Sequence, residues 1–184
     1  MSRKYKIRNP ESLYFVTFTV IHWIDVFIRK DYRDIFIESL KFCQQKKGLE
    51  LYAYCIMSSH IHMILGTNGR IRLENTIRDL KKYTATKIIY NIKNNSFESR
   101  KKWLIEIMED TGRMNNNNTR YQFWQQHNQP IELSDNLSMD NTLEYIHNNP
   151  VESGIVLSPE DYLYSSARNY AGLTETLIDV KFIE

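Results

Sequence analysis

The stretch that most constrains the fold is Leu51–Gly66, which reads LYAYCIMSSHIHMILG. Its two apolar runs are joined by two serines, a link short enough for a β-hairpin. Because side chains alternate between the faces of a strand, His60 and His62 are predicted to share one face, while Ile61 points to the other. Two neutral imidazoles on one face of a strand offer half of a site for a divalent metal ion. The same spacing also fits two solvent-facing histidines on a half-exposed strand.

Length and composition predict a single domain that occupies residues 1–184. Hydrophobic residues make up 42% of the chain and aromatic residues 12%, which is enough for a substantial core. There is no run of about 18 apolar residues, so we expect no membrane span, and the N-terminus lacks the apolar segment of a signal peptide. Cys43 and Cys55 have no metal-binding or redox spacing, so they are predicted to be reduced packing residues of a cytoplasmic protein.

Charge is distributed unevenly along the chain. Residues 1–102 contain 20 Lys and Arg against 9 Asp and Glu, whereas residues 103–184 contain 4 against 13. Such asymmetry indicates an anionic partner for the first part of the chain, with nucleic acid the leading candidate. The alternative is that the two halves attract each other within the fold.

Basic residues are concentrated in an N-terminal arm, 1–12, and on one face of a predicted helix that starts near Ile71. The arm either binds phosphate or only makes the chain more soluble, and the helix face either binds phosphate or is simply solvated. Tyr5, Tyr83 and Tyr90 either stack on unpaired bases or belong to the core, and for Tyr83 the core is predicted. The residues expected to contact nucleic acid are Arg3, Lys4, Lys6, Arg8, Arg78, Lys81 and Lys82.

The apolar pattern predicts the regular elements of the first half of the chain. Period-two alternation with β-branched and aromatic residues predicts strands at 13–21, 49–57 and 60–65. Apolar residues at helical spacing predict helices at 30–46 and 71–91.

The second half has a weaker pattern. A run of four asparagines lies near the end of a segment, 94–120, that is predicted to be a loop-rich insertion, with a turn or short extension at 103–108. A strand over 121–133 is predicted to follow, either continuous or broken at Pro130. A helix over 139–148 is predicted next, with Ser138 as N-cap and Pro150 ending the helix. The order is then βαββαβ with one added C-terminal helix, which predicts an α+β, ferredoxin-like antiparallel sheet with helices packed on it.

Tyr145 and Asn149 are four residues apart on that C-terminal helix, so they are predicted to share a face. A tyrosine phenolate can act as a covalent nucleophile, and an asparagine amide oxygen is a ligand that a hard divalent cation accepts. Because Asn149 precedes Pro150, its backbone is pushed away from the helical region, which distorts this geometry. The alternative is a core aromatic side chain at 145 and a C-terminal cap at 149.

Four segments occur in a characteristic order: CIMSSHIHMIL at 55–65, FWQ at 123–125, YIHNNPV with GIV at 145–156, and PEDYLYSSA at 159–167. Together they resemble the single-tyrosine HUH transposases of bacterial insertion sequences, and most closely the REP-associated tyrosine transposases. The resemblance covers about residues 13–170. It departs from the family pattern at Ser59, because the family commonly has asparagine or another side chain just before the first histidine.

This resemblance implies a role for each candidate residue. His60 and His62 match the metal-binding histidine pair, and Tyr145 matches the catalytic tyrosine. Asn149 stands where the family takes a third metal ligand from the tyrosine helix, and the expected metal is Mg²⁺ or Mn²⁺. The implied activity is nicking and rejoining of single-stranded DNA near hairpins through a 5′-phosphotyrosine intermediate. The implied partner is single-stranded or hairpin DNA, bound by a monomer or a homodimer.

Two other functions fit the same residues. One is a non-catalytic nucleic-acid-binding module on the same sheet. The other is a metal-dependent DNA hydrolase that uses His60 and His62 without a covalent intermediate. His147 lies two residues after the tyrosine and faces elsewhere on a helix, so it is assigned no catalytic role.

Overall fold

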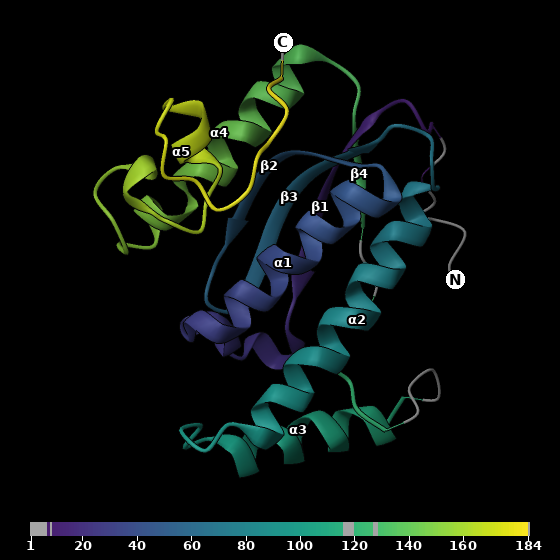
Figure 1. Ribbon diagram of the computed structural model, residues 1–184, viewed down its shortest axis with the longest axis vertical. Coiled ribbons are helices and arrows are strands. Elements are labelled where there is room, and N and C mark those ends of the chain that lie inside the picture. The colour runs from purple at the N-terminus through teal and green to yellow at the C-terminus, as the bar shows by residue number, and fades with distance from the viewer. Residues whose placement is uncertain (1–6, 8, 116–119, 127–128, 184) are drawn as a thin grey trace.

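The computed structural model describes residue 7 and residues 9–115, 120–126 and 129–183 (Figure 1). The strands are β1 (Leu13–Thr19), β2 (Leu49–Ile56), β3 (His60–Thr67) and β4 (Ile131–Leu133). The helices are α1 (Lys30–Lys47), α2 (Leu73–Asn94), α3 (Lys101–Arg113), α4 (Asn136–Glu152) and α5 (Ala167–Tyr170). Short 3₁₀ turns are η1 (Ile21–Trp23), η2 (Val26–Ile28) and η3 (Pro159–Asp161).

The four strands form one antiparallel sheet in the order β2-β3-β1-β4. The predicted α+β class and βαββαβ order are therefore confirmed, with α3 inserted before β4 and α4 following it. The predicted hairpin is also present, because β2 pairs with β3 across the two serines. None of the helices in the described part of the chain has the length and apolar character that a membrane span requires.

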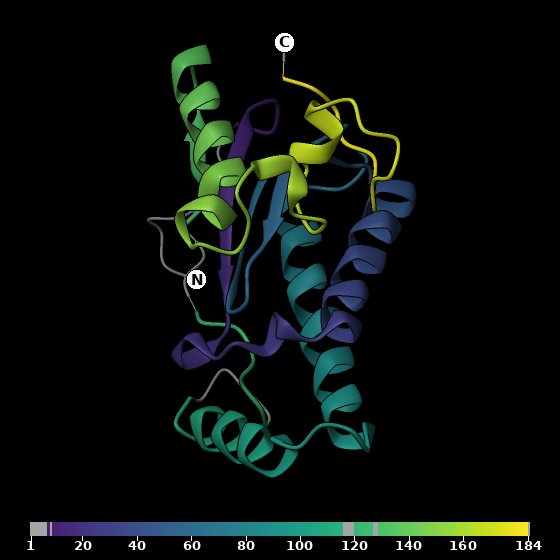
Figure 2. The same ribbon diagram turned by 90° about the vertical axis from the view of Figure 1, so that its left-hand side faces the viewer.

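Helices cover the two faces of the sheet unequally. In Figure 2, α1 and α2 lie along one face, and α4 lies on the other. Alternate side chains of β1 follow this division, since Val16 and Phe18 are fully buried while Thr17 between them is not. Phe18 packs edge-on against Phe36 of α1, with ring centroids 6.0 Å apart. Burying one such ring stabilises the fold by about 1.5–3 kcal/mol, so this face forms the main core.

The predicted loop-rich insertion at 94–120 is wrong in its middle part, where the chain forms α3. Leu104 and Met108 are four residues apart and fully buried, which holds the helix against the end of α2. Figure 1 shows α3 beneath α2, beyond the lower end of the sheet.

The predicted strand over 121–133 is wrong in extent before Pro130, and β4 begins directly after that proline, where a break was one of the two alternatives. Only β4 pairs along β1, and Trp124 forms an isolated bridge with Val20. The indole N–H of Trp124 instead donates to Thr84 Oγ1 at 3.2 Å, which draws this part of the segment under α2. Cys43 and Cys55 are buried and free, in agreement with their prediction as packing residues.

α4 is longer at both ends than predicted. The N-cap is Asp135, whose side chain accepts from the backbone N–H of Ser138 at 2.8 Å, so Ser138 lies inside the helix. Pro150 does not end the helix, which continues to Glu152. Because only two residues follow this proline, the lost hydrogen bond falls in the last turn, where it costs least. Asn149 therefore keeps its helical position.

Candidate active site

His60 and His62 lie on one face of β3, as strand alternation predicts. They stand opposite Thr19 and Thr17 of β1, respectively, on the side of the sheet where α4 packs. The two imidazole rings meet edge to face, with centroids 4.7 Å apart. Two ring nitrogens are thereby available close together at one place on a rigid strand pair.

The environment keeps both imidazoles neutral. His62 is only 5% exposed, and burial together with the neighbouring His60 lowers the pKa of His62 to about 3. Burial also lowers the pKa of His60. Thr17 Oγ1 lies 2.9 Å from Nδ1 of His62, which fixes the ring and directs Nε2 toward α4. Neutral imidazole is the form that binds a metal, so the pair is prepared for a cation at physiological pH.

Tyr145 reaches this pair from α4. Its hydroxyl oxygen lies 3.4 Å from Nε2 of His62, and the ring centroids are 5.2 Å apart. Phe15 of β1 packs against both rings and supports their orientation. Tyr145 is 43% exposed, so the alternative of a core aromatic side chain is wrong.

Asn149 lies one turn after Tyr145 on α4 and is 9% exposed. It is not the C-terminal cap, because that position belongs to Ser153. Among the residues that the structure describes, none forms a hydrogen bond with the Asn149 side chain. A nearly buried amide without such a partner leaves its oxygen free for a cation.

Trp23 is a residue of the site region that the sequence pattern does not reveal. Its ring stands edge-on to His60, with centroids 5.3 Å apart. His22 and Trp23 have φ values of 53° and 56°, a left-handed conformation that costs about 1–3 kcal/mol for each such residue. No glycine marks this turn, so the sequence has no signal for it. Two adjacent strained residues beside the histidines point to a functional constraint.

A family model described as "Transposase IS200 like" matches residues 13–106, which is half of the chain. The chain belongs to the IS200-like transposase family. A solved REP-associated tyrosine transposase bound to a REP hairpin has a TM-score of 0.64 and 16% identity, with all of this chain and 94% of that chain covered. A Deinococcus radiodurans structure, described as a transposase candidate, gives a TM-score of 0.46 and 15% identity over 80% of this chain and 97% of that one. No curated protein matches the chain.

The matched part of this IS200-like transposase includes both histidines but ends before α4. The likeness to the REP-associated enzyme at 16% identity extends over the whole chain and shows that the fold is shared. The roles of Tyr145 and Asn149 therefore depend on the geometry of this chain.

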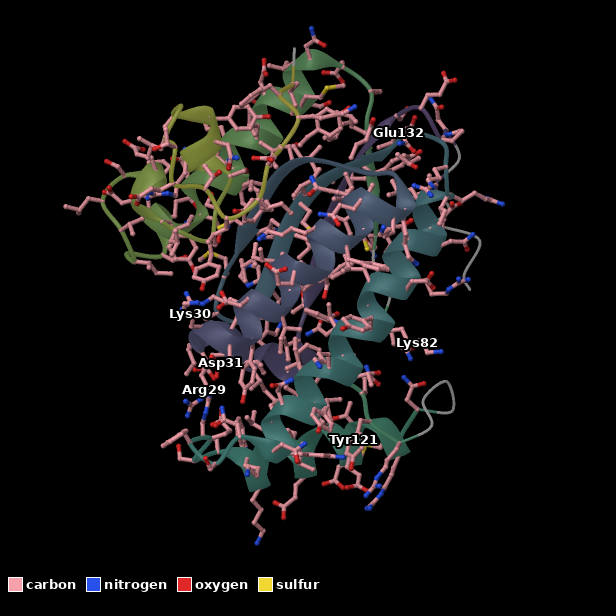
Figure 3. All side chains as sticks on the ribbon, viewed as in Figure 1. Arg29, Lys30, Asp31, Lys82, Tyr121 and Glu132 are labelled. Atoms are coloured by element: carbon pink, nitrogen blue, oxygen red, sulfur yellow. The ribbon has the colours of Figure 1, made fainter. Side chains whose placement is uncertain are left out.

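The residues expected on DNA that the structure describes, Arg78, Lys81 and Lys82, lie on α2 and not at the histidines. Arg3, Lys4, Lys6 and Arg8 lie outside the described residues. Arg78 and Lys82 are exposed on α2, which covers the sheet face opposite the histidines, and Figure 3 shows Lys82 pointing outward from that helix.

Lys81 is turned inward instead. It donates to the carbonyl of Gln125 at 3.0 Å and lies over the ring of Phe18, and burial lowers its pKa to about 8. Tyr83 was predicted to belong to the core but is exposed, because it lies off the buried stripe of α2 that includes Leu80 and Thr84.

The two imidazoles of the transposase are borderline ligands that accept several divalent cations. No three His, Cys, Asp or Glu side chains gather into a metal-binding group among the described residues. A site at the histidines thus contains two imidazoles and needs further oxygen ligands, which Asn149, water or phosphate can supply.

Proposed function

We propose that this transposase nicks and rejoins single-stranded DNA next to hairpins through a covalent bond between Tyr145 and a 5′ phosphate. The observation that carries the proposal is the 3.4 Å distance between the Tyr145 hydroxyl and Nε2 of His62. It brings a nucleophile to a pair of neutral imidazoles within one chain. Membership of the IS200-like family supports transposase chemistry, and the shared fold with an enzyme bound to a REP hairpin supports hairpin DNA as the substrate.

In this proposal His60 and His62 hold Mg²⁺ or Mn²⁺, and the Asn149 amide oxygen is the third ligand from the protein. When bound, the cation offsets the negative charge of the transferring phosphate. The contact between Thr17 and His62 holds one imidazole in the orientation that this requires. The low pKa of His62 keeps its lone pair free of a competing proton.

The chemical step exchanges one phosphate ester for another. The Tyr145 oxygen attacks phosphorus, a bond between them forms, and the bond from phosphorus to the 3′ oxygen of the preceding nucleotide breaks. The phenol proton passes to solvent, and the departing oxygen takes up a proton to become a 3′-OH. Since a phosphodiester is retained on the tyrosine, a 3′-OH can reverse the step and rejoin the strand.

The test is to incubate the protein with a labelled single-stranded hairpin oligonucleotide and Mn²⁺ and to look for a labelled protein–DNA adduct. We expect an adduct with the parent protein and none with Tyr145→Phe, while DNA binding is retained. Tyr83→Phe is the matched control, because that tyrosine is also exposed but lies on α2. Mass spectrometry of the tryptic adduct identifies the modified tyrosine.

The other functions predict different results. Unchanged cleavage by Tyr145→Phe would establish a hydrolase without a covalent intermediate. Binding without cleavage by the parent protein would establish a binding module. Adduct formation that survives a chelator would remove the metal from the mechanism.

Mixing two inactive variants tests whether one chain supplies the whole site. Tyr145 contacts His62 of the same chain, so we expect a mixture of Tyr145→Phe and His62→Ala to form no adduct. Recovery of adduct in the mixture would mean that the tyrosine acts on the histidines of a partner chain.

A further inference from the structure

A row of four aromatic rings runs across the candidate site. Successive centroids from Tyr145 through His62 and His60 to Trp23 are 5.2, 4.7 and 5.3 Å apart. Tyr145 lies at one end of the row and the histidines form its middle. Trp23 at the other end has no part in the proposed chemistry, yet it is the ring nearest to His60 on that side.

Trp23 has the exposure of a ligand-binding side chain. It is 59% exposed, although tryptophan is usually largely buried in a folded protein. Its side chain forms no hydrogen bond with any residue in the described part of the chain. The indole therefore presents a large apolar surface to solvent directly beside the histidines, where burial by a ligand is favourable.

Hydrogen bonds hold the backbone that carries this ring. The N–H of Trp23 donates to the carbonyl of Val20 at 3.1 Å, and Ile21 N–H donates to Phe123 at 2.9 Å. Nε2 of His22 lies 3.0 Å from Thr111 Oγ1 of α3, which fixes the other strained residue. A bulky residue is thus kept in the left-handed region by contacts on both sides. The indole is thus attached to an ordered backbone rather than to a free loop.

We propose that Trp23 stacks on one unpaired base of the DNA strand, at a nucleotide that flanks the phosphate attacked by Tyr145. This inference rests on the proposed function, because it takes single-stranded DNA as the ligand. Every nucleobase has a π-face, so the contact accepts any sequence at that nucleotide. Its role is to position the strand, so that the phosphate next to the stacked base lies over the histidines.

Binding is measured in the Tyr145→Phe background, where no cleavage interferes, by fluorescence anisotropy of a labelled hairpin oligonucleotide with single-stranded flanks. We expect Trp23→Ala to weaken binding about 5- to 150-fold, the range for loss of one base–aromatic stack. Trp23→Phe retains a π-face and should keep part of the affinity. Trp103→Ala is the matched control, because Trp103 is 48% exposed but lies on α3, and it should bind within twofold of the parent.

A second set of oligonucleotides carries a single abasic site at each flank nucleotide in turn. At one nucleotide, loss of the base should weaken binding by the parent as much as Trp23→Ala does, and the two changes together should add nothing. Equal effects of Trp23→Ala on every oligonucleotide would overturn the proposal, as would unchanged binding. The abasic series with the parent also tests the contact if Trp23→Ala fails to fold.

A metal-binding measurement distinguishes a Trp23 that stacks on a base from a Trp23 that only holds His60 in position. We expect the Mn²⁺ affinity of Trp23→Ala to equal that of the parent, and a parallel loss of metal affinity would overturn the proposal. The outcome is distinct from that of the proposed function. If the parent forms an adduct and Trp23→Ala binds DNA as well as the parent does, only the stacking inference is refuted. If binding depends on Trp23 but no adduct forms, only the proposed chemistry is refuted.

Discussion

Thr17→Val removes the hydroxyl that orients His62 and leaves the shape of the side chain almost unchanged. Thr17 Oγ1 is 2.9 Å from Nδ1 of a ring that is 5% exposed, so water cannot take its place. An unsatisfied buried polar group costs about 1–3 kcal/mol of unfolding free energy. Loss of a hydrogen bond behind a ligating imidazole typically costs 10–100-fold in metal affinity. We expect both effects in this variant.

Two assays separate these effects. Urea unfolding without metal should show the loss of stability, which is small enough for the protein to remain folded. Calorimetric titration with Mn²⁺ should show the 10–100-fold loss of affinity. Thr19→Val is the matched control, because Thr19 pairs with His60 in the same register but no hydrogen bond joins their side chains in the described structure. Mn²⁺ affinity of Thr17→Val within twofold of the parent would refute the assigned role of Thr17.

The remaining predictions concern stability, measured by urea unfolding. Glu98→Ala should lower the free energy of unfolding by about 3–5 kcal/mol, because this buried carboxylate pairs with Arg29 and its loss leaves the guanidinium uncompensated. Glu38→Ala is the control, because Glu38 is exposed and its loss should change the free energy of unfolding by less than about 1 kcal/mol. Burial raises the pKa of Glu98, but hydrogen bonds outweigh burial and lower this pKa below the usual 4.5. The stabilisation by Glu98 is therefore present above pH 4.5 and is lost as pH falls through the lowered pKa. Equal acid sensitivity of the parent and Glu98→Ala would contradict this. Gly48→Ala should lower the free energy of unfolding by about 2 kcal/mol or more, because φ at Gly48 is +71° and the added Cβ would lie 2.9 Å from the Cβ atom of Arg70. Gly154→Ala is the control, because φ is +68° but the added Cβ meets open space, and it should lower the free energy of unfolding by about 1 kcal/mol.

The sheet could be predicted because its signals are local. Alternation along β1 and the short link between β2 and β3 depend only on neighbouring residues, and strand geometry then places His60 and His62 on one face. Helix ends were less predictable. Both Asp135 and Ser138 are good capping residues, and the choice between them depends on how α4 enters the fold. α3 was predicted only as a turn or short extension because the asparagine run after it dominated the pattern, although Leu104 and Met108 have helical spacing.

The complete site could not be predicted from spacing. Tyr145 and His62 are separated by 83 residues, so their contact is a property of the tertiary structure, and only a family resemblance connected them beforehand. The basic helix face was a weaker guide. Arg78 and Lys82 lie on the far side of the sheet, since a charge count does not tell which face a helix covers. The left-handed turn at Trp23 has no glycine to reveal it.

The segment that follows α4 explains how the tyrosine helix is held at the histidines. Its backbone runs along the outer edge of β2, where Ile56 N–H donates to the carbonyl of Tyr164 and Ser166 N–H donates to Tyr54, each at 2.9 Å. The Tyr162 hydroxyl donates to the carbonyl of Ile56 at 2.7 Å. These contacts cover an otherwise open strand edge and fix the segment to the sheet.

His147 then connects α4 to that segment, because its Nε2 lies 2.9 Å from Ser166 Oγ. The imidazole is partly buried, and this desolvation lowers its pKa to about 4 and keeps it neutral. This histidine of the tyrosine helix therefore faces away from the chemistry and supports it from behind. The position of the Tyr145 hydroxyl depends on two attachments, its own contact with His62 and the anchoring of α4 through His147 to the edge of β2. A nucleophile that must approach a phosphate to within bonding distance needs this kind of rigid support.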